Sequence, residues 1–242
     1  MQGGAIIFFD SGVGGLTLLR ECARRLPGEN FVYFGDNGNA PYGNRPEREI
    51  RSLVFRAFKM FARIPVRAAV IACNTVTALC ADELRAAYPF PVVGVEPAVR
   101  PAAARGGRVL LLATRATLSS GRVRRLVAAN AAKAEIISFC PVRLAGEIEK
   151  NIFGLSAIRL EEHLPRGRFD AVVLGCTHYI FLRERIADFY KCPVFDGNTG
   201  TADHLAEILN ICSQNCVNLG RKTPVFRGKF KKFNKNVYNM LQ

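Results

Sequence analysis

The chain has 242 residues, of which 49% are hydrophobic and 22% charged, and its formal net charge at pH 7 is +14. This composition excludes a disordered or fibrous chain, and the length allows one large domain or two small ones. No apolar run reaches the roughly 20 residues of a membrane-spanning helix, and the N-terminus lacks the basic start of a signal peptide. We therefore expect a cytoplasmic protein that makes no use of a membrane.

Short apolar runs alternate with longer segments of helical periodicity along the whole chain. In chain order, the runs predicted as strands are residues 5–9, 31–34, 68–72, 91–95, 108–113, 134–139, 170–174 and 193–195. The segments predicted as helices are 15–26, 46–62, 74–87, 117–131 and 179–190, where apolar residues recur at three- and four-residue steps. Apolar runs without polar alternation are typical of parallel strands that helices cover on both faces. The predicted fold class is therefore α/β.

The chain divides into two halves that resemble each other. Prolines, glycines and arginines cluster at residues 97–107, and about four predicted strands lie on either side. The segment AVIACNT at 69–75 is echoed by AVVLGCTH at 171–178. Each places a cysteine and a hydroxyl residue just after a buried strand, where a helix begins. Because ligands of open α/β sheets bind at the carboxyl ends of strands, we expect two similar domains that face each other across a cleft.

The two echoing cysteines, Cys73 and Cys176, are the strongest candidates for chemistry. A helix N-terminus after each one is expected to lower the pKa of the thiol and to offer N–H groups to a carboxylate, with Thr75 and Thr177 adding hydroxyls. Two thiols on opposite sides of a small anion suit a racemase, in which one base removes the α-proton and the other thiol protonates the opposite face. The alternative for any single cysteine is core packing, since free cysteine behaves as a small hydrophobe.

Other site types are compatible with the same cysteine block. Cys176 and His178 could be metal ligands, although one intervening residue is poor chelate spacing and the sequence has no CxxC motif. They could also form a nucleophile pair, although the base of such a pair usually comes from elsewhere in the chain. Neither alternative explains why a similar block contains Cys73.

A glycine-rich run at residues 10–17, followed by Asp36, resembles a dinucleotide-binding fingerprint and so raises the alternative of an oxidoreductase. However, Thr17 occupies the third glycine position, and Asp10 would repel a pyrophosphate. Asp10 could instead cap a helix, hold an ammonium group or orient a thiol.

The positive charge is concentrated in two stretches without acids, residues 98–134 and the tail from residue 218, which includes Arg221 and Lys222. Such charge could bind a nucleic acid, but no nucleic-acid motif accompanies it. We expect solvated helix faces and mild attraction of anionic substrates, not a nucleic-acid partner.

Several blocks of the sequence resemble glutamate racemases in their order and spacing. They are DSGVGGL at 10–16, YFGD at 33–36, PYG at 41–43, ACNT at 72–75, GVEP at 94–97, AT at 113–114 with Thr117, and GCTHY at 175–179. The resemblance extends from the first strand to about residue 196. The DSGVGG and GCTH blocks together are highly specific.

The resemblance implies two α/β domains with the active site in the cleft between them. The first would comprise residues 1–97 completed by about 205–242, and the second about 98–204. The implied activity is interconversion of L- and D-glutamate without pyridoxal phosphate, metal or another cofactor, which supplies D-glutamate for peptidoglycan. A related racemase for aspartate is the nearest alternative, but the PYG block matches the pattern that receives the side-chain carboxylate of glutamate. The resemblance leaves a homodimer open.

The resemblance also implies roles for individual residues. Cys73 and Cys176 match the two catalytic thiols, and Asp10 and His178 match their acid–base partners. The residues that match substrate contacts are Asp10, Ser11, Tyr42, Gly43, Asn74, Thr75, Thr117, Thr177 and His178. The family often carries a glutamate that assists one thiol, and here Glu147 or Glu149 could fill that place. The chain departs from the family at Ile180 and Phe181, where Pro-Leu is usual, and in its basic tail.

Overall fold

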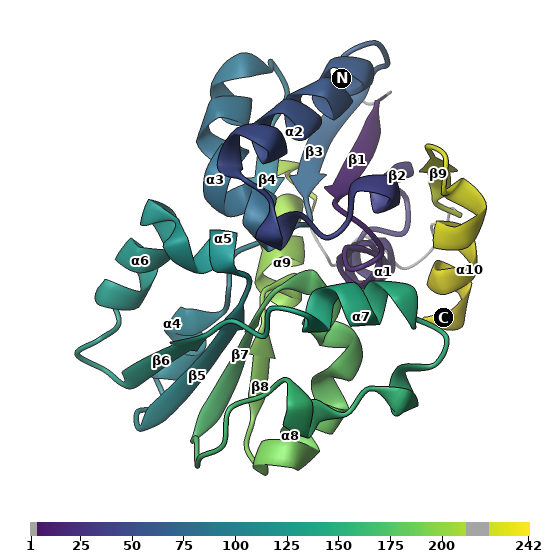
Figure 1. Cartoon of the computed structure of the whole chain (residues 1–242). Helices are drawn as coiled ribbons and strands as arrows, with labels where there is room; N and C mark the ends of the chain where they lie inside the picture. The colour runs from purple at the N-terminus through teal and green to yellow at the C-terminus, as the bar shows by residue number, and fades with distance from the viewer. Residues whose placement is uncertain (1–3, 212–222) are drawn as a thin grey trace.

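The computed structural model describes residues 4–211 and 223–242, which form two parallel β-sheets flanked by helices (Figure 1). Arg221 and Lys222 of the basic tail lie outside the described residues. The first sheet has the order β4-β3-β1-β2-β9 and consists of β1 (Ala5–Asp10), β2 (Phe31–Gly35), β3 (Val66–Ile71), β4 (Val92–Gly94) and β9 (Val225–Arg227). The second has the order β6-β5-β7-β8 and consists of β5 (Arg108–Ala113), β6 (Glu135–Phe139), β7 (Ala171–Gly175) and β8 (Val194–Asp196).

Helices connect the parallel strands, as crossover connections require. The α-helices are α1 (Leu16–Arg25), α2 (Glu47–Phe61), α3 (Asn74–Ala87), α4 (Val99–Ala103), α5 (Arg115–Ser119), α6 (Gly121–Ala128), α7 (Leu144–Lys150), α8 (Arg183–Tyr190), α9 (Asn198–Ile208) and α10 (Lys231–Met240). Short 3₁₀ turns are η1 (Asn37–Asn39), η2 (Tyr42–Asn44), η3 (Leu155–Ala157), η4 (Leu160–Glu162) and η5 (Thr177–Leu182). Within the described residues, no helix combines the length and apolar character needed to cross a membrane.

Both faces of each sheet are buried, which explains the continuous apolar runs of the strands. One face of the first sheet packs against α2 and α3, and the other packs against α1, α9 and α10. In the second sheet, one face packs against α4 and α6, and the other against α7 and α8. The core beneath α1 is continuous with the core beneath α7 and α8, so the two halves are held close together. This arrangement confirms the predicted α/β fold.

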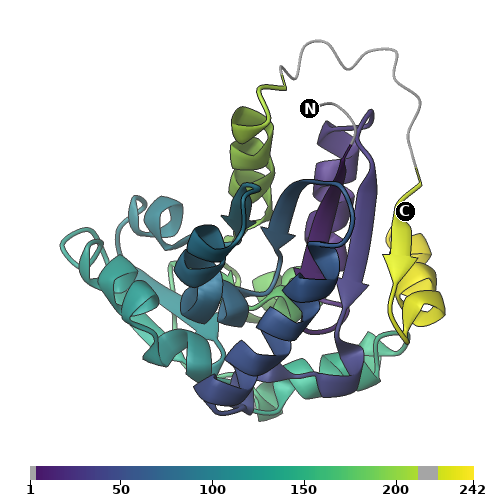
Figure 2. The ribbon, with the colours of Figure 1, turned by 90° about the horizontal axis from the view of Figure 1, so that it is seen from above.

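The C-terminal segment returns to the first sheet. Strand β9 lies parallel to β2, with Tyr33 opposite Phe226, and α10 packs behind it (Figure 2). Helix α9 precedes this return and packs against α1. The sequence patterns did not predict β9, α4, α7, α9 or α10.

Two predicted helices have a different form in the structure. The segment 117–131 is divided into α5 and α6 at Ser120, whose hydroxyl accepts a hydrogen bond from the N–H of Val123 and so begins a new helix. The segment 179–190 begins as the 3₁₀ turn η5 and becomes α-helical only at Arg183.

Candidate active site

Cys73 and Cys176 occupy equivalent places in the two sheets. Cys73 follows β3 and directly precedes α3, and Cys176 follows β7 and directly precedes η5. Both cysteines are 6% exposed. They line one small cavity between the two sheets.

The cavity collects most of the residues that the sequence analysis singled out. Its lining residues are Ser11, Pro41, Tyr42, Gly43, Cys73, Asn74, Thr75, Thr114, Ala145, Cys176, Thr177 and His178. The volume is about 10 Å³, which is space for about one water molecule. Two predicted contact residues, Asp10 and Thr117, do not line it but lie fully buried behind its wall.

Cys73 lies beside a hydroxyl and a buried carboxylate. Its Sγ is 3.6 Å from the Oγ of Ser11. Burial, together with the negative charge of Asp10, raises the pKa of the Cys73 thiol to about 12, although the N–H of Val76 at the start of α3 opposes the shift. The N–H at the start of α3 acts in the predicted direction, but desolvation outweighs it, so the pKa of Cys73 is raised and not lowered.

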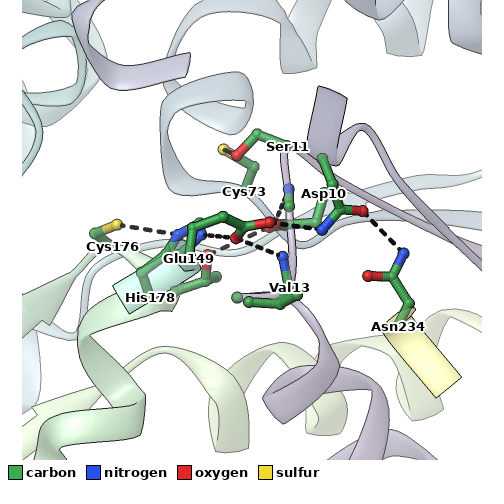
Figure 3. A network of polar contacts seen from close by, with 12 residues as sticks. Asp10, Ser11, Val13, Cys73, Glu149, Cys176, His178 and Asn234 are labelled. Atoms are coloured by element: carbon green, nitrogen blue, oxygen red, sulfur yellow. Dashed lines mark hydrogen bonds and ion pairs between the residues drawn. The ribbon is translucent and has the colours of Figure 1, made fainter. Parts of the chain in front are cut away.

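Cys176 lies beside a paired histidine. Its Sγ is 3.9 Å from Nδ1 of His178, whose Nε2 is 2.6 Å from Oε2 of Glu149 (Figure 3). Burial alone would lower the pKa of His178, but its bonds to Cys176 and Glu149 raise that pKa well above the ordinary value. Burial would likewise raise the pKa of Glu149, but its bond to His178 is the largest of several that lower it. The pair is therefore an imidazolium and a carboxylate.

The structure distinguishes between the two candidate glutamates. Glu149 contacts His178, whereas Glu147, two residues earlier on α7, binds Nε2 of His163 at 3.0 Å. Glu149 also accepts a 3.0 Å bond from the N–H of Val13, in the glycine-rich loop of the first sheet. A Cβ atom on Gly12 would lie 2.3 Å from Oε2 of Glu149, so this approach requires glycine.

Asp10, at the end of β1, links the loop of the first sheet to the second. One carboxylate oxygen accepts a 2.8 Å bond from the N–H of Gly12, and the other accepts a 3.2 Å bond from the hydroxyl of Thr177. Asp10 is fully buried, and this burial raises its pKa. The carboxylate therefore lies between the two halves and close to Cys73.

Three threonine hydroxyls meet at the cavity, two from lining residues and one, Thr117, from behind them. Oγ1 of Thr75, at the start of α3, is 2.9 Å from Oγ1 of Thr114 and 3.2 Å from Oγ1 of Thr117. Thr114 follows β5, so it could have been predicted as a cavity residue by the strand-end rule that identified the cysteines.

The comparisons with known proteins identify the family of the chain. The family model described as Asp/Glu/Hydantoin racemase matches residues 16–205. The chain belongs to this family. A glutamate racemase from Clostridium acetobutylicum is 39% identical over 224 residues, which cover 85% of this chain and 86% of the relative.

Solved structures of family members have the same fold. A glutamate racemase isoform from Bacillus anthracis superposes with a TM-score of 0.81 at 28% identity, over 100% of this chain and 95% of that one. The glutamate racemase of Francisella tularensis, in complex with D-glutamate, gives a TM-score of 0.77 at 25% identity over 99% and 95% of the two chains. Family membership thus confirms the resemblance found in the sequence.

A contact in the structure accounts for Asp36, which suggested a dinucleotide site. Its Oδ2 accepts a 2.5 Å bond from the hydroxyl of Tyr42, so this carboxylate holds a cavity residue in place. Among residues 4–211 and 223–242, no group of three or more His, Cys, Asp or Glu is placed to bind a metal ion.

Proposed function

We propose that the protein is a glutamate racemase that interconverts L- and D-glutamate without a cofactor, by proton transfer between Cys73 and Cys176. The observation that carries the proposal is that these two cysteines, from equivalent strand ends of two sheets, line the same small cavity. The curated relatives named glutamate racemases support the choice of substrate.

The proposed reaction needs one thiolate and one thiol. The thiolate removes the hydrogen of the α-carbon and becomes a thiol, while the electron pair stays on the substrate as a planar carbanion. The second sulfur then delivers its proton to the opposite face and becomes a thiolate. The configuration is inverted, and proton exchange with water restores the starting charges.

The surroundings of each sulfur suit one half of this reaction. Because the pKa of Cys73 is raised to about 12, Cys73 keeps its proton at neutral pH until a strong base such as a carbanion accepts it. His178, held as an imidazolium by Glu149, supplies positive charge and an N–H donor to Cys176 whenever that sulfur is a thiolate.

The cavity offers groups for both carboxylates of glutamate. We propose that the backbone N–H groups of Asn74 and Thr75, at the start of α3, bind the α-carboxylate, together with the hydroxyl of Thr177, which then gives up its bond to Asp10. Tyr42 and Gly43 are proposed to receive the side-chain carboxylate. Since the cavity holds about one water molecule, entry of glutamate requires the two halves to move apart.

The remaining expectations belong to the same proposal. We propose that the domains divide near residue 97 and that the C-terminal segment completes the first domain, which the pairing of β9 with β2 supports. A racemase of this kind would work in the cytoplasm and supply D-glutamate for peptidoglycan. Sedimentation of the purified protein distinguishes a monomer from a homodimer.

The direct test follows the optical activity of D-glutamate and of D-aspartate mixed with the purified protein and no added cofactor. We expect racemisation of glutamate, with aspartate slower by at least about 100-fold because its shorter side chain cannot reach the Tyr42 site. Faster racemisation of aspartate would contradict the assigned substrate.

The cysteine variants test the two thiols. Cys73→Ser and Cys176→Ser should each abolish turnover and keep the fold. The control Cys192→Ser, outside the cavity, should retain turnover.

A further inference from the structure

A chain of side-chain amides links the C-terminal helix to the active site. Asn234, in α10, is 0% exposed, and its Nδ2 donates to Oδ1 of Asn37 at 3.0 Å. Nδ2 of Asn37 in turn donates to Oε1 of Glu149 at 2.6 Å. Figure 3 shows Asn234 at one end of this chain and Cys176, beyond Glu149 and His178, at the other.

The chemistry of the groups fixes the orientation of both amides. A carboxylate only accepts hydrogen bonds, so Asn37 must turn its NH₂ group toward Glu149 and its oxygen toward α10. Asn234 must then donate, and its own oxygen is left buried without a partner among the described residues. An unpaired buried acceptor costs about 1–3 kcal/mol. A helix that only covered the sheet would bury an apolar side chain here, as α10 does with Val237.

The end of β2 leaves room for the two amides to meet. A Cβ atom on Gly35 would lie 2.8 Å from Nδ2 of Asn234 and 2.8 Å from Oδ1 of Asn37, which is closer than such contacts allow. Glycine at this position therefore permits the bond between the C-terminal helix and the η1 turn.

We propose that Asn234 is a positioning residue for racemisation, which acts through Asn37 to fix the carboxylate of Glu149 against His178 and thereby prepares Cys176. This inference rests on the proposed function, in which Cys176 is one of the two thiols. It makes the C-terminal helix a support of the active site as well as a cover of the first sheet.

The effect of Asn234 is expected to be confined to one thiol. The bond from Asn37 is one of those that lower the pKa of Glu149, whose other charged or titratable neighbours are His178, Asp10 and Tyr33. Without Asn234, the oxygen of Asn37 loses its donor and the amide is held from one side only, so its bond to Glu149 and the ion pair with His178 weaken. Cys73 has different neighbours, Ser11 and Asp10, and should not respond.

The test compares Asn234→Leu with Asn236→Leu, the same substitution at an exposed position of the same helix. Leucine keeps the shape of asparagine and removes its donor. We expect kcat for glutamate to fall about tenfold in Asn234→Leu, with KM within about twofold. Alkylation of Cys176 by iodoacetamide, followed by peptide mass spectrometry, should slow about fivefold relative to Cys73 in the same sample. Thermal stability should change little, since the unpaired oxygen of Asn234 is removed while the oxygen of Asn37 loses its donor.

Asn37→Leu tests the same link from its other end, even if Asn234→Leu does not fold. Because the two residues act in one chain, the double variant should lose no more activity than Asn37→Leu. Equal kcat and an equal Cys176-to-Cys73 alkylation ratio in Asn234→Leu and Asn236→Leu would overturn the proposal. An equal change in the alkylation rates of Cys73 and Cys176 would also overturn it, because that result indicates a general opening of the active site. An unchanged Cys176-to-Cys73 alkylation ratio in Asn37→Leu would overturn it as well. If the wild-type protein does not racemise glutamate, the proposed function fails, but the alkylation ratio still reports on the link.

Discussion

At the scale of single residues, the two thiols are equivalent in position but not in surroundings. Cys73 faces a hydroxyl and the negative charge of Asp10, whereas Cys176 faces the imidazolium of His178. A racemase that works in both directions needs each sulfur as acid in one direction and as base in the other. The raised pKa of Cys73 keeps this thiol protonated at neutral pH.

Asp10→Asn tests the role of the buried carboxylate beside Cys73. The charge of Asp10 raises the pKa of Cys73, so its removal lowers that pKa, and Cys73 loses its proton at a lower pH. We expect kcat to fall about 100-fold with KM within about twofold, and the alkaline limb of the kcat profile to move to lower pH. Steady-state kinetics between pH 6 and 10 measures the fall in kcat and detects an alkaline limb that enters this range only in the variant, since the wild-type pKa of about 12 lies above it. Unchanged turnover would make Asp10 a structural turn residue only.

At the scale of elements, the sequence predicted those strands and helices that a local pattern of apolar residues determines. The buried runs identified eight of the nine strands that the described residues form, all but β9, and the cysteine blocks identified the strand ends that meet at the cavity. Helix α7 has only two turns and strand β9 three residues, so neither has enough residues to produce a periodicity. Both are defined by packing against distant segments.

Glu149 and Asn234 show why part of the site could not be predicted. Glu147 and Glu149 lie two residues apart on a short helix, so they point to different sides, and only the placement of α7 decides which one meets His178. Asn234 reaches the site through Asn37, from which it is 197 residues distant in the chain. No local pattern encodes such a contact.

Gly12→Ala tests the close approach of the glycine-rich loop to α7. The added methyl group would meet Oε2 of Glu149 at 2.3 Å, so the carboxylate or the loop must move. We expect kcat to fall at least about tenfold and the free energy of unfolding to fall by about 1–3 kcal/mol. Kinetics and thermal melting measure these changes. Gly200→Ala is the matched control because nothing lies within 4 Å of its added carbon, and it should keep wild-type kcat.

At the scale of the whole molecule, polar contacts hold the two halves together around the cavity. Glu149 of the second half binds Val13 and Asn37 of the first, and Thr177 binds Asp10. These contacts leave a cavity of about 10 Å³, so under the proposed function they must rearrange for glutamate to enter.

The ion pair between Glu149 and His178, both in the second half, makes the stability of the protein depend on pH. The folded pKa of Glu149 is lowered, so its contribution is complete above about 4.5 and is lost as pH falls through the folded value. The folded pKa of His178 is raised, so its contribution is complete below about 6.5 and is lost as pH rises through the folded value. The pair therefore stabilises the protein most between about pH 4.5 and 6.5.

Glu149→Gln should reveal this window. At pH 5.5 the variant is expected to lose about 1–3 kcal/mol of unfolding free energy, and at pH 9 or above the difference from wild type should be smaller. Denaturant titration at the two pH values measures it, and a difference that grows with pH would refute the assignment. Glu147→Gln serves as the activity control, because Glu147 binds His163 and not His178, and it should keep kcat within about twofold.

The measurement that most directly tests transfer between two thiols is the fate of the α-hydrogen in deuterium oxide. Starting from L-glutamate, mass spectrometry of the separated enantiomers early in the reaction should find one deuterium in the D-glutamate formed and none in the remaining L-glutamate. This result is expected because one sulfur removes hydrogen and the other, exchanged with solvent, delivers deuterium. D-glutamate that keeps the original hydrogen, or equal labelling of both enantiomers from the first turnovers, would contradict two-base catalysis by Cys73 and Cys176.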